Sequence, residues 1–181
     1  MTATETLKHE HRIIQLVLGG ARREAERIQS AARMHGENVR KILDFFANFV
    51  DRCHHVKEEK HLFTTLEKRG MSAKSGPVAV MLQEHEDGRR IVAAIHKALP
   101  KAAAGNKSAL AAVSENLLSY VELLRGHIDK EDNVLYRLAD GVLTPEDQKA
   151  LSEAFEKLEA EEMGEGVHEK YHRLAHELEN G

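Results

Sequence analysis

The chain has 181 residues, the length of one domain, and its net charge of −4 with a pI near 6.3 gives no basic surface for nucleic acid or an anionic membrane. No apolar run approaches the roughly 18 residues that a membrane span requires, and the first residues lack the basic and then apolar pattern of a secretory signal. A single cysteine, Cys53, excludes an internal disulfide framework and leads us to expect a cytoplasmic protein.

Apolar residues recur with helical rather than strand spacing in four long blocks. The expected helices cover about residues 6–34, 37–69, 77–100 and 108–140. Gly70 is expected to end the second helix, and Pro100 with the AAAGNKS stretch at 102–108 to end the third. Four long helices joined by short loops predict an all-α fold, an antiparallel up-down-up-down four-helix bundle over residues 1–140.

Two additional helices are expected after residue 140. Thr144 is a good N-cap, and Pro145 follows it at the first helical position. The last helix carries its apolar residues on one side, at Val167, Tyr171, Leu174 and Leu178. We therefore predict that residues 141–181 form a C-terminal helical extension packed on the same domain.

Each long helix places a histidine on its apolar stripe, where a core residue is expected. These histidines are His11, His54, His85 and His127. Glu58 and Glu131 follow two of them at i+4, which brings imidazole and carboxylate to the same helix face. A lone histidine in such a place is usually a hydrogen-bonded core residue. Four histidines with two buried carboxylates instead indicate a cation, since unpaired buried carboxylates are costly and this donor set suits iron, manganese or zinc.

The pattern H…HxxxE…H…HxxxE, in the contexts EHRII, CHHVKEEKHLF, LQEHEDGRRIV and GHIDKEDNVLY, resembles the hemerythrin-like, HHE cation-binding family over about residues 5–140. The resemblance implies two iron ions with an oxo or hydroxo bridge inside a four-helix bundle, with zinc or manganese as substitutes. It implies that Glu58 and Glu131 bridge the irons. The terminal ligands it implies are His11 and His54 on one iron and His85 and His127 on the other.

One position departs from the oxygen-carrying hemerythrins, which have two histidines one turn apart on the third helix. Here Arg89 stands one turn after His85. A guanidinium cannot replace an imidazole ligand, so the fifth histidine is missing or comes from elsewhere. His61, one α-helical turn after Glu58, is the candidate. His55 is expected to orient a ligand or to be partly exposed, although the choice between His61 and His55 stays open.

Four other residues near these motifs are expected to have a structural rather than a metal-binding role. Lys57 and Glu59 are expected on a solvated helix face, with the alternative that Glu59 orients a ligand histidine. Tyr120 and Tyr136 are expected to pack in the core, with a hydrogen bond near the metals as the alternative.

Three functions fit a di-iron centre of this kind. The first is reversible binding of a small diatomic ligand, O2 or NO, or of peroxide, by a carrier or sensor. The second is an enzyme that decomposes hydrogen peroxide or performs another oxygen-linked redox reaction. The third is an iron-handling or interaction protein. We expect no nucleic-acid or membrane partner, and a monomer or weak homodimer.

Overall fold

The computed structural model describes residues 1–164 and 166–180, and every regular element among them is helical. The first helix, α1, spans Ala3–Ala31 and begins three residues before the expected start. Thr2 and Glu5 form a capping box that satisfies the first backbone N–H groups, which explains this early start. None of the described helices is both long and apolar enough to cross a membrane.

The second long helix is a continuous run with two widened, π-helical segments. It comprises α2 (Gly36–Phe45), η1 (Phe46–His55), η2 (Lys57–Leu62) and α3 (Phe63–Lys68). The third, α4, spans Gly76–Ala103 and ends inside the AAAGNKS stretch, as expected, although Pro100 itself lies within the helix. Pro100 lacks an N–H and so removes one helical hydrogen bond, and only three residues follow it before the helix ends. The fourth run comprises α5 (Lys107–Lys130), η3 (Glu131–Leu135) and α6 (Tyr136–Val142).

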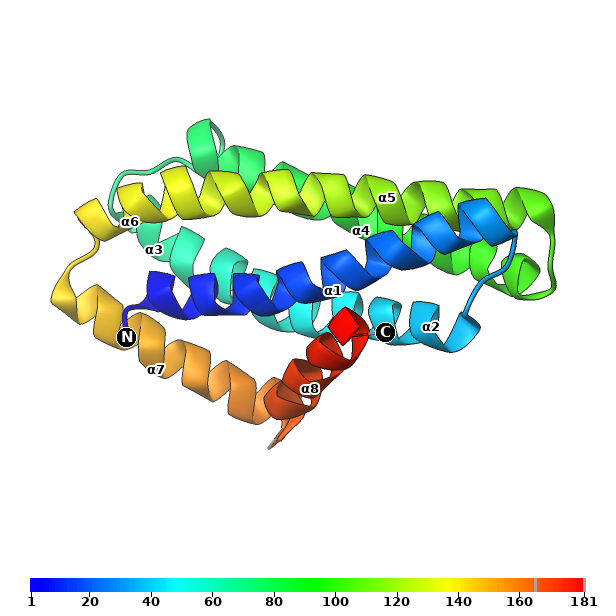
Figure 1. Ribbon diagram of the computed structural model, residues 1–181. Coiled ribbons are helices and arrows are strands. Elements are labelled where there is room, and N and C mark those ends of the chain that lie inside the picture. The colour runs from blue at the N-terminus through cyan, green and yellow to red at the C-terminus, as the bar shows by residue number, and fades with distance from the viewer. Residues whose placement is uncertain (165, 181) are drawn as a thin grey trace.

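These four runs lie side by side along one long axis (Figure 1). Following the chain in Figure 1, α1 and α4 run in one direction, and the run from α2 to α3 and the run from α5 to α6 return in the other. α5 packs against both α1 and α4. This arrangement brings the middle of all four runs to the same level.

The C-terminal part covers one side of these helices with α7 (Pro145–Leu158), η4 (Glu159–Met163) and α8 (Val167–Asn180). α7 begins as expected, with Thr144 capping Asp147 and Pro145 in the first turn. α7 and η4 contact the second run, and α8 packs on α1 and α2.

Two apolar cores lie on either side of a polar layer. Along α1, Leu7 belongs to one core, His11 lies between, and Ile14 belongs to the other. Along the fourth run, Leu124 and Leu135 flank the polar layer in the same way. The candidate site therefore sits between two water-excluding regions.

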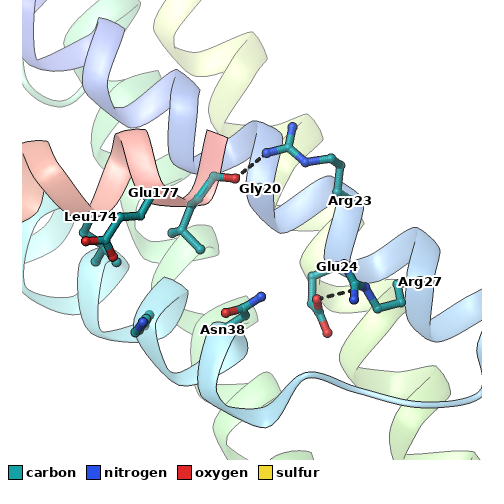
Figure 2. A pocket seen from close by; sticks show the side chains of 9 residues that line it. Gly20, Arg23, Glu24, Arg27, Asn38, Leu174 and Glu177 are labelled. Atoms are coloured by element: carbon teal, nitrogen blue, oxygen red, sulfur yellow. Dashed lines mark hydrogen bonds and ion pairs between the residues drawn. The ribbon is translucent and has the colours of Figure 1, made fainter. Parts of the chain in front are cut away.

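α8 packs closely on α1 at Gly20. A methyl group there would lie 3.1 Å from Leu178 Cβ and 3.2 Å from the Leu178 carbonyl oxygen. Arg23, one turn later, donates a hydrogen bond to the same carbonyl, as Figure 2 shows. Gly20 thus permits a contact that any side chain would obstruct.

Two neighbouring substitutions should therefore change stability with opposite signs. Gly19→Ala should raise the free energy of unfolding by about 0.5–1 kcal/mol, because alanine favours a helix and its methyl meets only the Arg23 side chain at 3.7 Å. Gly20→Ala should lower it by about 1–2 kcal/mol through overpacking against α8. Urea unfolding measures both, and a stabilising Gly20→Ala would contradict the close packing of α8.

Candidate metal centre

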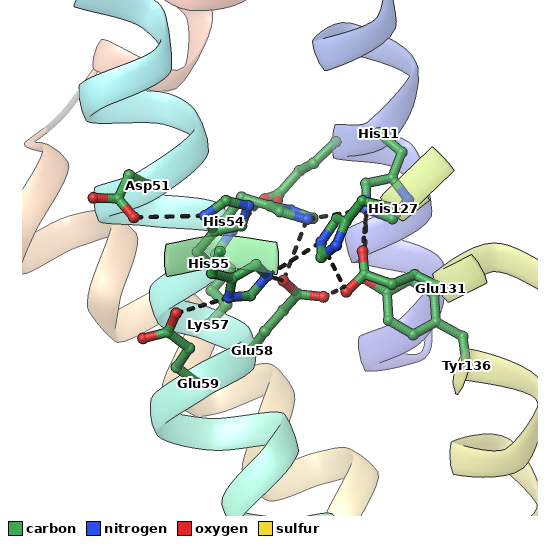
Figure 3. Close-up of polar contacts among 12 residues, drawn as sticks. His11, Asp51, His54, His55, Lys57, Glu58, Glu59, His127, Glu131 and Tyr136 are labelled. Atoms are coloured by element: carbon green, nitrogen blue, oxygen red, sulfur yellow. Dashed lines mark hydrogen bonds and ion pairs between the residues drawn. The ribbon is translucent and has the colours of Figure 1, made fainter. Parts of the chain in front are cut away.

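Seven side chains from the four long runs meet in the polar layer and form two groups of donor atoms. The first group is His11, His54 and Glu131, and the second is His55, Glu58, His85 and His127. Within each group the donor atoms lie within 4.8 Å of one another, and all seven residues are buried. We call these seven residues the centre. Figure 3 shows His11, His54, His55, His127 and the two glutamates converging on one region.

The histidines are paired through their inward nitrogens. His11 Nε2 and His54 Nε2 are 3.0 Å apart, and His85 Nε2 and His127 Nε2 are 3.1 Å apart. Two imidazole nitrogens at this separation suit neighbouring positions around one cation. Each pair joins two different helical runs.

Each glutamate lies between the two pairs. Glu131 has Oε2 at 3.2 Å from His11 Nε2 and Oε1 at 3.2 Å from His127 Nε2. Glu58 Oε2 is 3.7 Å from His54 Nε2 and 3.4 Å from His85 Nε2. Each carboxylate therefore faces one histidine of each pair.

Several inward polar atoms have no hydrogen-bond partner among the residues that the structure describes. They are both carboxylate oxygens of Glu131, Oε2 of Glu58 and both ring nitrogens of His55. Such atoms are costly to bury unless something else satisfies them. Anionic oxygens with neutral imidazoles are the donors that iron, manganese and zinc accept, so the residues present fit a metal.

A carboxylate holds the outer nitrogen of each of the four paired histidines. His11 Nδ1 donates to Asp132 (2.8 Å) and His54 Nδ1 to Glu10 (2.8 Å). In the same way, His85 Nδ1 donates to Glu59 (2.7 Å) and His127 Nδ1 to Glu84 (3.0 Å). These contacts fix the ring orientation and turn Nε2 toward the centre.

These carboxylates form a closed circuit around the four runs. Glu10 of α1 holds His54 of the second run, and Glu59 of the second run holds His85 of α4. Glu84 of α4 in turn holds His127 of α5. Asp132 of the fourth run closes the circuit on α1. The sequence suggested only Glu59 for such a role. The missed signal is that each of the four acids stands next to a proposed ligand, in the pairs EH at 10–11, EE at 58–59, EH at 84–85 and ED at 131–132.

The structure does not bring His61 to the centre. Its ring is half-buried and faces Phe155 of α7 at 6.3 Å between centroids. His55 instead lies in the second group and is 4% exposed, so of the two roles expected for it, partial exposure was wrong. The cause is the π-helical backbone of η1 and η2. Its i→i+5 hydrogen bonds place more residues in each turn, so the α-helical spacing that aligned His61 with His54 does not apply.

Lys57 is fully buried, contrary to its expected place on a solvated face. Its ammonium forms ion pairs with Glu10 of α1 and Glu159 of η4. Cys53, Glu10 and Glu159 form a third set of neighbouring donor atoms, and Lys57 already supplies positive charge there. Because Glu10 also holds His54, Lys57 connects the C-terminal extension to the centre.

Tyr136 contacts the centre from the fourth run. Its hydroxyl donates a 2.5 Å hydrogen bond to Glu58 Oε1 and lies 3.5 Å from His11 Nε2. Burial and the nearby carboxylates raise the pKa of the Tyr136 phenol well above its ordinary value, so it keeps its proton. Tyr120 packs on Phe46, as expected for a core residue.

In the metal-free protein the paired histidines attract protons. Burial lowers the pKa of His11, but the hydrogen bond to Asp132 and the nearby Glu131 carboxylate outweigh it and raise the pKa to about 9. Burial also lowers the pKa of His127. The nearby carboxylates of Glu131 and Glu84 outweigh burial and raise this pKa to about 10. The pKa of Glu131 falls well below its ordinary value because His127 and His11 outweigh its burial.

Metal uptake should therefore release protons. At pH 7, binding has to displace protons from His11 and His127, so apparent affinity should rise with pH until about pH 10. Since both folded-state pKa values exceed the ordinary 6.5, the metal-free fold gains stability below that pH and loses it as the pH rises through 9 and 10. Zinc titration calorimetry in buffers of different ionisation enthalpy measures the release. A proton count unchanged between pH 7 and pH 10 would contradict these pKa directions.

Comparison with known proteins identifies the family to which the chain is similar. A family model described as the hemerythrin HHE cation binding domain matches residues 2–139. Uncharacterized proteins of Mycobacterium bovis and of two strains of Mycobacterium tuberculosis are each 24% identical over 165 residues. The match covers 91% of this chain but 64% of each relative, so the chain spans less than two thirds of their length. No solved structure matches the chain.

Proposed function

Since this chain belongs to the hemerythrin HHE cation-binding domain family, we propose that it is a non-haem di-iron protein. The first iron position uses His11 and His54, and the second uses His85 and His127. His55 lies beside the second position, in the place expected for His61. Glu58 and Glu131 bridge the two positions, together with an oxo or hydroxo group. Zinc or manganese can substitute, because the same imidazole and carboxylate donors suit them.

One observation carries this proposal: both buried glutamates face a histidine of each pair. Their distances of 3.2 to 3.7 Å to four inward nitrogens describe two positions that share two carboxylates. A single cation would leave one pair and several buried oxygens without a partner.

The proposal includes the architecture around the centre. The alternating directions of the four runs in Figure 1 support an antiparallel up-down-up-down four-helix bundle over residues 1–140. The contacts of α7 and α8 with these runs support residues 141–181 as an extension of the same domain. We place the protein in the cytoplasm, as a monomer or weak homodimer.

Two reduced iron ions in such a centre supply the electrons with which O2, NO or peroxide is bound or reduced. The surrounding residues do the rest: the outer carboxylates orient the imidazoles, and the two apolar cores exclude water. Tyr136 orients Glu58 and retains its proton because burial raises its pKa. A centre whose neighbouring phenol does not release protons favours reversible ligand binding, so we propose a carrier or sensor of O2, NO or peroxide.

Metal analysis and anaerobic spectroscopy test this function. We expect two irons per chain and, after reduction, a visible band that appears with O2 and disappears under argon. Zinc-loaded protein, which has no redox chemistry, is the control. Irreversible oxidation with sustained O2 release from hydrogen peroxide would favour the enzyme hypothesis over the carrier. Failure to bind two metal ions would refute the proposed di-iron centre.

A further inference from the structure

A cavity of about 270 Å³ lies between the second run and α4, beside the second donor group. His55 and His85 form part of its lining, and the exposed residues Ala93 and His96 line it as well. The cavity therefore extends from the protein surface to His85, a proposed ligand of the second metal position, and to His55 beside it.

His55 reaches this cavity as a buried group with unused hydrogen-bonding capacity. It stacks on His85 with 3.8 Å between ring centroids, and neither of its nitrogens hydrogen-bonds to a described residue. The Asp51 carboxylate lies 3.5 Å from its Nδ1 (Figure 3). A metal, or a molecule that arrives through the cavity, would give one of these buried nitrogens the partner it lacks among the described residues.

The walls include several apolar side chains. Phe46, Val92 and Tyr120 line the cavity, and Tyr120 packs directly on Gly88. A methyl group on Gly88 would lie 3.3 Å from Tyr120 Cε2. A cavity of this size with such walls admits a small molecule and gives a large polar solute few partners.

The charges beside the cavity are mostly negative. The Arg89 guanidinium contacts Asp51 at 2.8 Å, Glu59 at 2.7 Å and Glu86 at 2.5 Å. Three carboxylates surround one guanidinium, and His96 adds at most one positive charge. An anion that approaches meets a surplus of negative charge, whereas an uncharged molecule does not respond to it.

We propose that this cavity is the entrance through which a small uncharged molecule reaches the His55–His85 side of the centre, and that the carboxylates around Arg89 disfavour anions. This inference rests on the proposed di-iron function and adds the route and the selectivity of its ligand. It predicts that NO enters more readily than azide.

The route is tested with two adjacent alanines. Ala93 lines the cavity and Ala94 does not, although both are exposed. In reduced, iron-loaded protein, Ala93→Phe should slow NO association by about tenfold or more, because the phenyl ring fills space that the ligand needs. Ala94→Phe should leave the rate unchanged, and both variants should keep the wild-type iron content.

The selectivity is tested at Glu86, which is exposed and contacts Arg89. Glu86→Lys should raise the azide association rate about fivefold or more at low salt and leave the NO rate unchanged. Glu153→Lys on α7 makes the same charge change far from the cavity and should alter neither rate.

Xenon gives a readout that needs no metal. In metal-free protein, xenon should shift the methyl resonances of Ala47, Val92 and Ala93, and Ala93→Phe should abolish the shifts at the first two. If the wild-type protein binds NO and Ala93→Phe binds it at the same rate, the proposed route is wrong, while the proposed function still stands. Equal acceleration of azide by both lysine variants overturns the selectivity. Absence of NO binding in wild-type protein refutes the proposed function, and the entrance with it.

Discussion

Replacing Glu131 with glutamine should reduce the bound metal from two ions per chain to one or fewer. The carboxylate has one oxygen 3.2 Å from His11 Nε2 and the other 3.2 Å from His127 Nε2. An amide keeps the shape but offers one neutral oxygen and an NH2 group that repels a cation. One of the two positions therefore loses an anionic ligand.

Metal analysis after iron or zinc loading measures this loss. Glu58→Gln should act in the same way, because Glu58 Oε2 faces His54 and His85. Glu153→Gln, at an exposed position on α7, is the matched control and should retain two ions. Two ions in both Glu58→Gln and Glu131→Gln would show that these residues do not bridge the metals.

Lys57→Met should lower the free energy of unfolding by about 3–5 kcal/mol, the usual cost of removing one partner of a buried ion pair. Methionine fits the space of the lysine stem, so the loss comes from charge. Glu10 is 1% exposed and would keep a negative charge without its cation. Glu159, which is partly exposed, can regain water.

Urea unfolding of the metal-free protein measures this effect. Lys149→Met is the control: its contact with Glu153 is 3.9 Å long and exposed, so the change should stay below about 1 kcal/mol. Adding Glu10→Gln to Lys57→Met should recover part of the loss, because the buried negative charge that Lys57 balanced is removed as well. A single substitution that costs no more than the control would show that Lys57 is hydrated in solution.

The all-helical fold and the approximate helix ranges followed from apolar spacing, because α-helical periodicity holds over most of the chain. The same periodicity failed at His61 and His55, where π-helical turns shift the register. Nothing in CHHVKEEKHLF marks such a turn, since widening depends on packing around the site. Burial of Lys57 was also missed, because it requires Glu10 and Glu159, which lie 47 and 102 residues away in sequence.

The circuit of acids also encodes the direction of each helix in the chain. In α1 and α4 the acid precedes its neighbouring ligand, at Glu10–His11 and Glu84–His85. In the two returning runs it follows, at Glu58–Glu59 and Glu131–Asp132. Successive residues of a helix are roughly 100° apart around its axis. In the returning runs the helix direction is reversed and the acid follows its ligand instead of preceding it, so the two reversals cancel and the rotation from ligand to acid keeps the same sense. All four acids therefore point the same way around the axis, and their order in the sequence is a local marker of helix polarity that does not depend on the connecting loops.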